Sequence, residues 1–174
     1  MMLSLLPRAV NQWSNTRGFS IGLGTYIIPK KETEDKKRDR MKMAINQVGE
    51  VINLVRRGQL VPQMGNTIRS EMEYRIIDIL DKVRSSTGKM IMGTLPTSNA
   101  ALTMLYSGSK GKDTNIFQVM ACTGQEVILG NRIAKTYGGR CYPSYQKYVD
   151  GAIERGFSPF SFMQGVTPEQ YFFQ

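Results

Sequence analysis

Residues 33–57 read TEDKKRDRMKMAINQVGEVINLVRR, and Gly58 follows them directly. Apolar side chains recur in this stretch at the three- and four-residue spacing of one helix face: Met41, Ile45, Val48, Ile52 and Val55. The two closing arginines suit the negative end of a helix dipole, and Gly58 suits a left-handed C-cap. We therefore predict an α-helix over 33–57. Its early cations are either a solvated helix start or an electropositive rim facing nucleic acid or nucleotide: Lys36, Lys37, Arg38 and Arg40.

A second helix with the same kind of pattern follows a short turn at 62–65. Asn66 or Thr67 can cap its start, and the pattern runs to about Ser86. Its apolar stripe has five members: Ile68, Met72, Ile76, Leu80 and Val83. Charged side chains, Glu71 and Glu73 among them, are expected to cover its other faces. Together the two segments predict an antiparallel helical hairpin with one apolar stripe on each arm.

Shorter elements complete a mainly α fold. Two short helices are predicted at 98–106 and 114–123, each entered through a Ser or Thr that suits an N-cap. Residues 124–148 have scattered glycines and no sustained period, so we expect mostly loop with a short strand. Thr167 and Pro168 suit the cap and the first position of a last helix. The fold class is thus a helical hairpin plus short helices and irregular loops.

The composition excludes several functions. The chain has 174 residues, no His, and only two Cys, which we expect to be reduced thiols: Cys122 and Cys141. Ser/His and Cys/His catalysis and a four-ligand zinc site are therefore excluded, and neither a metal nor a cofactor is expected. The apolar opening at 1–7 is too short to span a bilayer, so no membrane partner is expected. The net charge of +9 modestly favours phosphate-bearing partners.

Six further stretches carry a family resemblance. They are RGFSIGLG at 17–24, LTMLYSGSKG at 102–111, NIFQVMACTGQ at 115–125, GNRI at 130–133, GF at 156–157 and GVTPEQYFF at 165–173. In this order and spacing, around a helical hairpin, they resemble the largest subunit of multisubunit DNA-dependent RNA polymerases. The eukaryotic and large-DNA-virus versions are the most similar. The resemblance covers the chain from about Arg17 to Gln174.

The resemblance implies a division of the chain into four parts. Residues 1–30 resemble the end of the pore domain, and 31–112 resemble the helical funnel. Residues 113–157 form a short helix and loop segment, and 158–174 resemble a truncated start of the bridge-helix region. Tyr171, Phe172 and Phe173 at this end are expected to expose their rings.

The resemblance also implies what the chain does and does not do. In the family, three Asp residues hold magnesium upstream of this region, and no Asp-x-Asp occurs here. Thr25 stands where the family often has Asp. We therefore expect no catalysis by the chain alone, although the complex it resembles is a DNA-directed RNA polymerase, a nucleotidyltransferase. The implied function is a non-catalytic segment, or an inactive homologue, of the largest subunit that shapes the secondary channel in transcription.

The expected partners follow from the same resemblance. They are other polymerase subunits, a transcript-cleavage factor at the funnel rim, and nucleic acid indirectly. The expected location is intracellular, in the host nucleus or cytoplasm for a viral protein. The alternative function is a free-standing basic module that binds nucleic acid or a polymerase as a regulator.

Six residues are candidates for a functional site. Two are implied to face the channel through which nucleotides pass: Lys110 and Lys112. Three amides are implied to contact the bridge helix: Asn115, Gln118 and Gln125. Arg132 is expected to be a structural cation that bonds loop carbonyls rather than a ligand contact.

Overall fold

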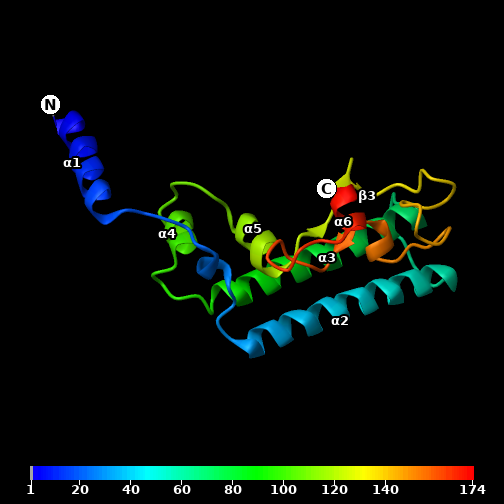
Figure 1. The fold of residues 1–174 in the computed structure, drawn as a ribbon. Helices are drawn as coiled ribbons and strands as arrows, with labels where there is room; N and C mark the ends of the chain where they lie inside the picture. The colour runs from blue at the N-terminus through cyan, green and yellow to red at the C-terminus, as the bar shows by residue number, and fades with distance from the viewer. Residues whose placement is uncertain (1) are drawn as a thin grey trace.

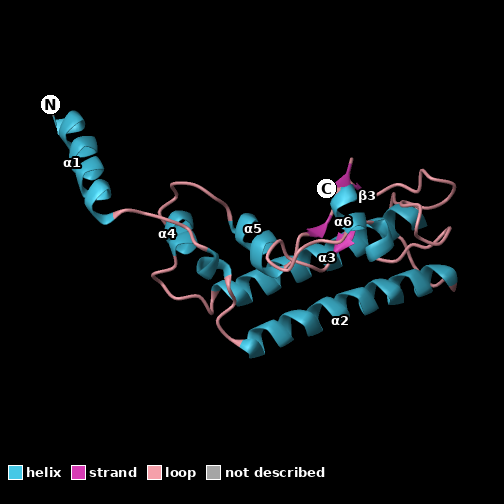
Figure 2. Cartoon of the chain, in the orientation of Figure 1, coloured by secondary structure: helices cyan, strands magenta, loops and turns pink. Residues whose placement is uncertain are grey.

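The computed structural model describes residues 2–174 and shows a long helical hairpin with short elements packed along one arm (Figures 1 and 2). The helices are α1 (Met2–Arg17), α2 (Lys31–Arg56), α3 (Ile68–Met92), α4 (Ala100–Tyr106), α5 (Asp113–Ile116) and α6 (Pro168–Phe173). A π-helical turn (Phe117–Ala121) continues α5, and 3₁₀ turns lie at Leu23–Tyr26 and Ile153–Arg155. The prediction of a mainly α fold is confirmed.

Two pairs of very short strands lie among the loops. Strand β1 (Gly124–Gln125) pairs antiparallel with β4 (Phe157–Ser158). Strand β2 (Val127–Ile128) pairs antiparallel with β3 (Asn131–Arg132) in a hairpin. The first pair matters for the fold because it ties the chain after the π-helical turn to a segment more than thirty positions later.

The ends of the hairpin arms are fixed by local hydrogen bonds. At the end of α2, Gly58 has φ +68, and the Gln59 N–H donates to the carbonyl of Leu54 at 2.9 Å. This is the left-handed C-cap predicted from the sequence. At the start of α3, the Thr67 hydroxyl accepts from the Ser70 N–H, and the Ser70 hydroxyl accepts from the Thr67 N–H. The reciprocal cap fixes where the second arm begins.

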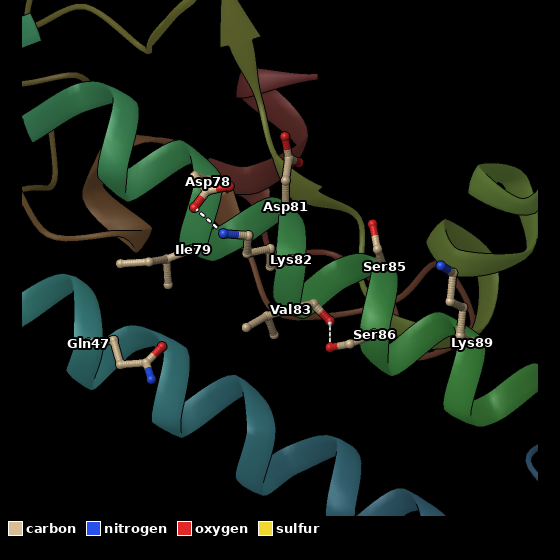
Figure 3. A pocket seen from close by; sticks show the side chains of 9 residues that line it. All are labelled: Gln47, Asp78, Ile79, Asp81, Lys82, Val83, Ser85, Ser86 and Lys89. Atoms are coloured by element: carbon tan, nitrogen blue, oxygen red, sulfur yellow. Dashed lines mark hydrogen bonds and ion pairs between the residues drawn. The ribbon is translucent and has the colours of Figure 1, made fainter. Parts of the chain in front are cut away.

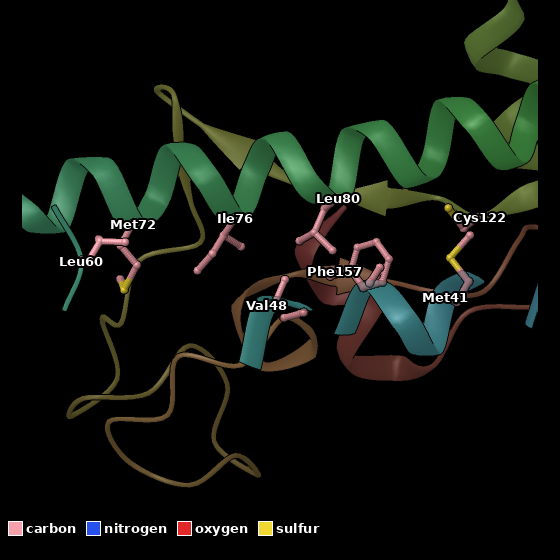
Figure 4. Packing of buried hydrophobic residues seen from close by; sticks show 10 residues of the cluster. Met41, Val48, Leu60, Met72, Ile76, Leu80, Cys122 and Phe157 are labelled. Atoms are coloured by element: carbon pink, nitrogen blue, oxygen red, sulfur yellow. The ribbon is translucent and has the colours of Figure 1, made fainter. Parts of the chain in front are cut away.

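The main core lies between α2 and α3 (Figure 4). Met41 and Val48 of α2 meet Ile76 and Leu80 of α3, and Phe157 packs against them without any exposure. Other buried members are Ala44, Leu60, Met72, Cys122 and Ala152. The predicted stripes therefore form the core, except at Ile68, which begins α3 and is half exposed.

Helix α3 runs to Met92, beyond the predicted end near Ser86. At Gly88 a Cβ would lie 2.1 Å from Cδ1 of Phe117, so the aromatic ring occupies the space that a side chain would need. The last turns of α3 then support a second core cluster: Ile91, Ala101, Leu102, Ile116, Met120 and Ala121. One long helix thus carries both cores.

Helix α1 was not predicted, and it projects from the rest of the fold (Figure 1). Between residues 5 and 17 its apolar side chains are exposed, among them Leu6, Val10 and Trp13. The Arg17 guanidinium lies 5.4 Å from the centroid of the Trp13 ring. Across residues 2–174, none of the helices combines the length and the apolar character needed to cross a membrane.

Helix α6 begins at the predicted cap, where the Thr167 hydroxyl accepts from the Gln170 N–H. The aromatic side chains of this helix are less uniformly exposed than predicted. Phe173 is only partly exposed, because its ring packs against Tyr142 and Tyr145, with ring centroids 6.3 and 6.4 Å away. Tyr171 and Phe172 remain largely exposed.

Three charged side chains expected in solvent are buried instead. Lys37 near the start of α2 is 3% exposed, and Glu71 and Glu73 of α3 are 1% and 5% exposed. Each has a hydrogen-bond partner in the chain, which compensates the cost of removing a charge from water. The expectation that these positions cover solvent-facing sides of the helices is therefore wrong.

Candidate functional site

A small pocket brings together three of the residues chosen from the sequence. Lys110, Lys112 and Asn115 line a cavity of about 80 Å³. Its remaining lining comes from α4, the loop after it, α5, the π-helical turn and the segment before α2: Ile21, Tyr26, Ala101, Met104, Leu105, Gly111, Ile116 and Val119. The pocket therefore has an apolar floor and two lysines at its edge.

Asn99 holds the two sides of this pocket together. Its Oδ1 accepts from the N–H groups of Ala101 and Leu102 and so caps α4, at 3.0 and 3.3 Å. Its Nδ2 donates to the carbonyl of Thr25 at 2.8 Å. The side chain is buried, so one residue positions both α4 and the segment that carries Tyr26. We predicted a Ser or Thr cap for this helix, so the capping role of Asn99 was not foreseen.

The loop that carries the lysines is ordered by its own hydroxyl groups. The Ser107 and Ser109 hydroxyls both donate to the carbonyl of Met104, at 3.0 and 3.2 Å. The Lys112 N–H donates to Oδ1 of Asn115 at 3.0 Å, which caps α5. Lys110 and Lys112 are exposed, and neither forms a salt bridge with another residue in 2–174. Two unpaired cations thus stand on a fixed loop beside an apolar pocket.

The three amides chosen from the sequence do not form one site. Asn115 is exposed and caps α5. Gln118 is half-buried, and its backbone carbonyl accepts a hydrogen bond from the Phe162 N–H at 3.1 Å. Gln125 is buried, and its Nε2 donates to the carbonyls of Glu126 and Arg155 while its Oε1 has no hydrogen-bond partner in the described chain.

Arg132 lies at the centre of a buried charge network. Its Nε donates to Glu73 at 2.8 Å, and its Nη1 donates to the carbonyl of Asp150 at 2.9 Å. Arg155 donates to the same Glu73 at 3.1 Å and to the Asp150 carboxylate at 2.6 Å. Lys135 also lies 2.7 Å from that carboxylate. Arg132 thus bonds one loop carbonyl, but its main partner is a carboxylate on α3.

The network affects the titration of Asp150. Burial acts to raise the pKa of its carboxyl group, but hydrogen bonds and charges from Lys135 and Arg155 outweigh burial, so the pKa is lowered. The network joins α3 to the loops at 131–155, which otherwise have little regular structure. We therefore assign Glu73, Arg132 and Arg155 a structural role.

Lys37 lies in a second pocket, of about 330 Å³, between α2 and the loop at 159–164. Its ammonium donates to the carbonyl of Met120 at 3.0 Å and lies 3.4 Å from Glu34. Burial lowers the pKa of Lys37, and the nearby Glu34 carboxylate partly opposes that shift. The Lys37 ammonium thus links α2 to the π-helical turn through its hydrogen bond to Met120.

Another hollow lies between the two long helices (Figure 3). It has a volume of about 570 Å³, and its lining side chains come from α2 and α3: Gln47, Asp78, Ile79, Asp81, Lys82, Val83, Ser85, Ser86 and Lys89. Most of its charges are paired, as Asp78 is with Lys82 at 2.6 Å and Asp81 with Arg84 at 3.0 Å. It contains none of the residues chosen from the sequence.

The two cysteines are buried and free. Burial raises the pKa of Cys122 to about 12, so this thiol stays protonated near neutral pH. Within residues 2–174, no group of three or more His, Cys, Asp or Glu side chains is placed to hold a metal ion. The candidate site is therefore the pocket edged by Lys110 and Lys112.

Comparison with known proteins identifies the family. Residues 52–158, which include α3, the second core cluster and the pocket lysines, match the family described as RNA polymerase Rpb1, domain 4. The chain belongs to this family.

The relatives of this Rpb1 domain 4 chain include the RPC1 subunit of DNA-directed RNA polymerase III from several organisms. The chain is 31% identical over 173 residues to the DNA-directed RNA polymerase III subunit RPC1 of Trypanosoma brucei brucei, with 99% of the chain and 11% of the relative covered. It is 34% identical over 171 residues to RPC1 of Debaryomyces hansenii and 33% identical over 171 residues to RPC1 of Homo sapiens. In both, 98% of the chain and 12% of the relative are covered. The chain thus spans about one eighth of the length of these relatives, and the resemblance to the largest subunit seen in the sequence is confirmed.

Proposed function

We propose that this chain is a non-catalytic segment of a DNA-directed RNA polymerase largest subunit that shapes the secondary channel during transcription. The single observation that carries the proposal is the pair Lys110 and Lys112. Both are exposed, unpaired within residues 2–174, and fixed on a loop whose hydroxyl and amide groups are already bonded. Such cations attract the phosphates of a passing nucleotide without contributing a metal ligand.

The hairpin supports this proposal as a rigid wall. Helices α2 and α3 share a continuous core, and α3 is also joined to the later loops through Glu73, Arg132 and Arg155. A wall of this kind keeps the lysine loop at a constant position. The implied partners are the other subunits of the polymerase and a transcript-cleavage factor, with nucleic acid contacted indirectly.

The division into 1–30, 31–112, 113–157 and 158–174 stays part of the proposal. The main core includes residues of the second part and also Cys122 and Phe157 of the third. We therefore expect the second and third parts to unfold together. The bridge-helix contacts proposed for Asn115, Gln118 and Gln125 would be made mainly by Asn115 and Gln118, because Gln125 is buried among loop carbonyls.

The test is kinetic and uses the polymerase whose largest subunit contains this segment. Lys110→Glu should raise the KM for nucleoside triphosphates about threefold or more and leave kcat nearly unchanged, because the charge assists entry rather than chemistry. Lys89→Glu is the matched control, since Lys89 is an exposed lysine that lines the other hollow. Equal effects of the two variants, or no effect of Lys110→Glu, would refute the channel role.

A second measurement separates the proposal from the alternative of a free-standing regulator. The segment is tagged in its own cells, the tagged protein is purified, and its peptides are mapped. Peptides continuous with this segment on both sides, in one large chain, support the proposal. A tagged protein of the size of this segment alone, which binds nucleic acid or a polymerase reversibly, would support the regulator.

A further inference from the structure

The pocket between the first turns of α2 and the loop at 159–164 has no role in the proposed channel. We call it the Lys37 pocket. Its volume of about 330 Å³ lies at the lower end of the range for small-molecule sites. Its apolar lining side chains are Met41, Ile45, Pro159 and Phe160. Its polar and charged ones are Glu34, Lys37, Arg38, Lys42 and Gln164. An apolar wall thus meets a charged rim in one cavity.

Both walls of the Lys37 pocket are fixed by contacts within the chain. On the loop side, the Thr123 hydroxyl and N–H both donate to the carbonyl of Phe160, at 2.7 and 2.9 Å. On the helix side, Met41 is buried in the main core. The Gln164 amide donates to the Glu34 carboxylate at 2.8 Å and so joins the loop directly to α2. A ligand therefore meets a formed pocket, and little entropy is lost in ordering it.

Positive charge exceeds negative charge around the pocket. Among residues 2–174, its lining contains three cations, Lys37, Arg38 and Lys42, and one carboxylate, Glu34. Arg38 is paired with Asp35 at 3.1 Å. Lys42 is exposed and forms no salt bridge with another residue in 2–174. The rim of the pocket therefore attracts an anion.

Lys37 is the buried member of this group of cations. Burial lowers its pKa even though the Glu34 carboxylate opposes the shift, so the chain compensates only part of the cost of removing this charge from water. An anion in the pocket supplies further compensation. Its attraction to a buried ammonium is also screened less by water and salt than its attraction to an exposed one.

We propose that the Lys37 pocket binds a small amphipathic anion, in which an apolar ring or branched chain carries one carboxylate, sulfonate or phosphate group. The apolar part packs on the wall that includes Phe160, which is 42% exposed and so has surface left to bury. The anionic group lies at the rim near Lys42. A free inorganic anion leaves the apolar wall unused, and a neutral apolar molecule removes water from the cations without replacing its hydrogen bonds. The proposal goes beyond the channel role, because this pocket shares no residue with that of Lys110 and Lys112.

The test measures binding of naphthalenesulfonate to the full chain by isothermal titration calorimetry. For an anion of this size we expect a Kd on the order of 1 mM or below. Two-dimensional NMR of the backbone amides locates the probe, and the shifts should centre on Phe160 and Gln164. A probe that binds with its shifts elsewhere in the chain would contradict the proposal.

Three variants predict changes of opposite sign. Phe160→Ala should weaken binding about fivefold, because it removes part of the apolar wall. Lys42→Glu should weaken it at least about fivefold, because it places a like charge beside the sulfonate. Glu34→Gln removes the lining carboxylate, keeps an acceptor for Gln164, and should strengthen binding about threefold. All three side chains lie outside the buried core, so the variants should fold.

Control variants and control ligands complete the experiment. Trp13→Ser on α1 and Lys89→Glu at the hollow in Figure 3 change exposed side chains and should leave binding unchanged. Naphthalenesulfonamide, a neutral analogue of the same shape, should bind at least about fivefold more weakly. An equal concentration of sulfate, at constant ionic strength, should not displace the probe.

Four results would overturn the proposal. They are absence of binding at about 10 mM probe, equal affinity for the sulfonamide, displacement of the probe by sulfate, and losses in the control variants as large as those in Phe160→Ala. None of these outcomes bears on the KM effect of Lys110→Glu, so the two proposals fail separately.

Discussion

Removing the Glu73 carboxylate is the most informative perturbation of the fold. Glu73 accepts three hydrogen bonds from two arginines: 2.8 and 3.3 Å from Arg132, and 3.1 Å from Arg155. Both guanidinium groups are nearly inaccessible to solvent, with side chains 0% and 5% exposed. In Glu73→Ala the two buried cations therefore lose their shared counter-charge.

The expected loss follows from what remains. Arg155 keeps the Asp150 carboxylate at 2.6 Å, whereas Arg132 keeps only one carbonyl, at 2.9 Å. Breaking one side of a buried ion pair costs about 3–5 kcal/mol. We expect Glu73→Ala to lower the free energy of unfolding by that amount. For a chain of this size, that corresponds to about 6–20 °C in the melting midpoint.

Urea unfolding followed by circular dichroism measures this loss. The matched control is Asp78→Ala on the same helix, where the pair with Lys82 at 2.6 Å is exposed and should contribute less than about 1 kcal/mol. A double-mutant cycle of Glu73→Ala with Arg132→Met should give a coupling energy above about 1.5 kcal/mol. A loss for Glu73→Ala no larger than that of Asp78→Ala would refute a structural role for the network.

Three further predictions concern the core, a glycine contact and the pH dependence of stability. Ile76→Asp should destabilise the fold by about 4 kcal/mol or more, because it buries an unpaired charge at a fully inaccessible site; an unchanged urea midpoint would contradict the assigned core. Gly88→Ala should lower the free energy of unfolding by about 1–3 kcal/mol, because its Cβ would meet the Phe117 ring. Gly49→Ala has open space around its Cβ and should stabilise α2 by about 0.5–1 kcal/mol. Thermal midpoints of the two variants that move in the same direction would contradict this. The pKa of Asp150 is lowered in the folded state, so its ionised carboxylate contributes to stability above the unfolded pKa of about 4, and this contribution is lost as pH falls through the folded pKa. The difference in unfolding free energy between the unmutated chain and Asp150→Asn should therefore shrink at low pH. A difference that stays constant with pH would contradict this.

The sequence was sufficient for the hairpin because its signals are local. Apolar residues three or four positions apart define the inner faces of α2 and α3, and Gly58 and Thr67 mark where one arm ends and the next begins. Thr167 likewise marked the start of α6. Caps and periodicity depend on neighbours within one or two turns, and they are readable without knowing the fold.

The parts that were missed depend on contacts between distant residues. Lys37 is bonded to a carbonyl 83 positions away, and Glu73 meets arginines 59 and 82 positions away. Nothing near these side chains distinguishes them from solvent-facing charges. The predicted end of α3 near Ser86 was wrong as well, because the last turns of the helix pack in the second core cluster, whose other members come later in the chain. For the candidate site, the sequence chose both lysines, but Asn99, which joins the two walls of the pocket, was not recognised.

The distribution of charge separates the residues that build the fold from those that can meet a partner. Arg132, Arg155 and Lys37 are buried, and their donors are satisfied by carboxylates or carbonyls of the chain itself. The cations at the pocket, Lys110 and Lys112, are exposed and lack such partners within residues 2–174. Replacing a buried cation leaves a carboxylate or a carbonyl unsatisfied, so it should change stability first. Replacing an exposed, unpaired cation leaves the fold unchanged, so an effect on nucleotide entry reports the loss of an external contact. Stability and binding should therefore respond to different sets of mutations.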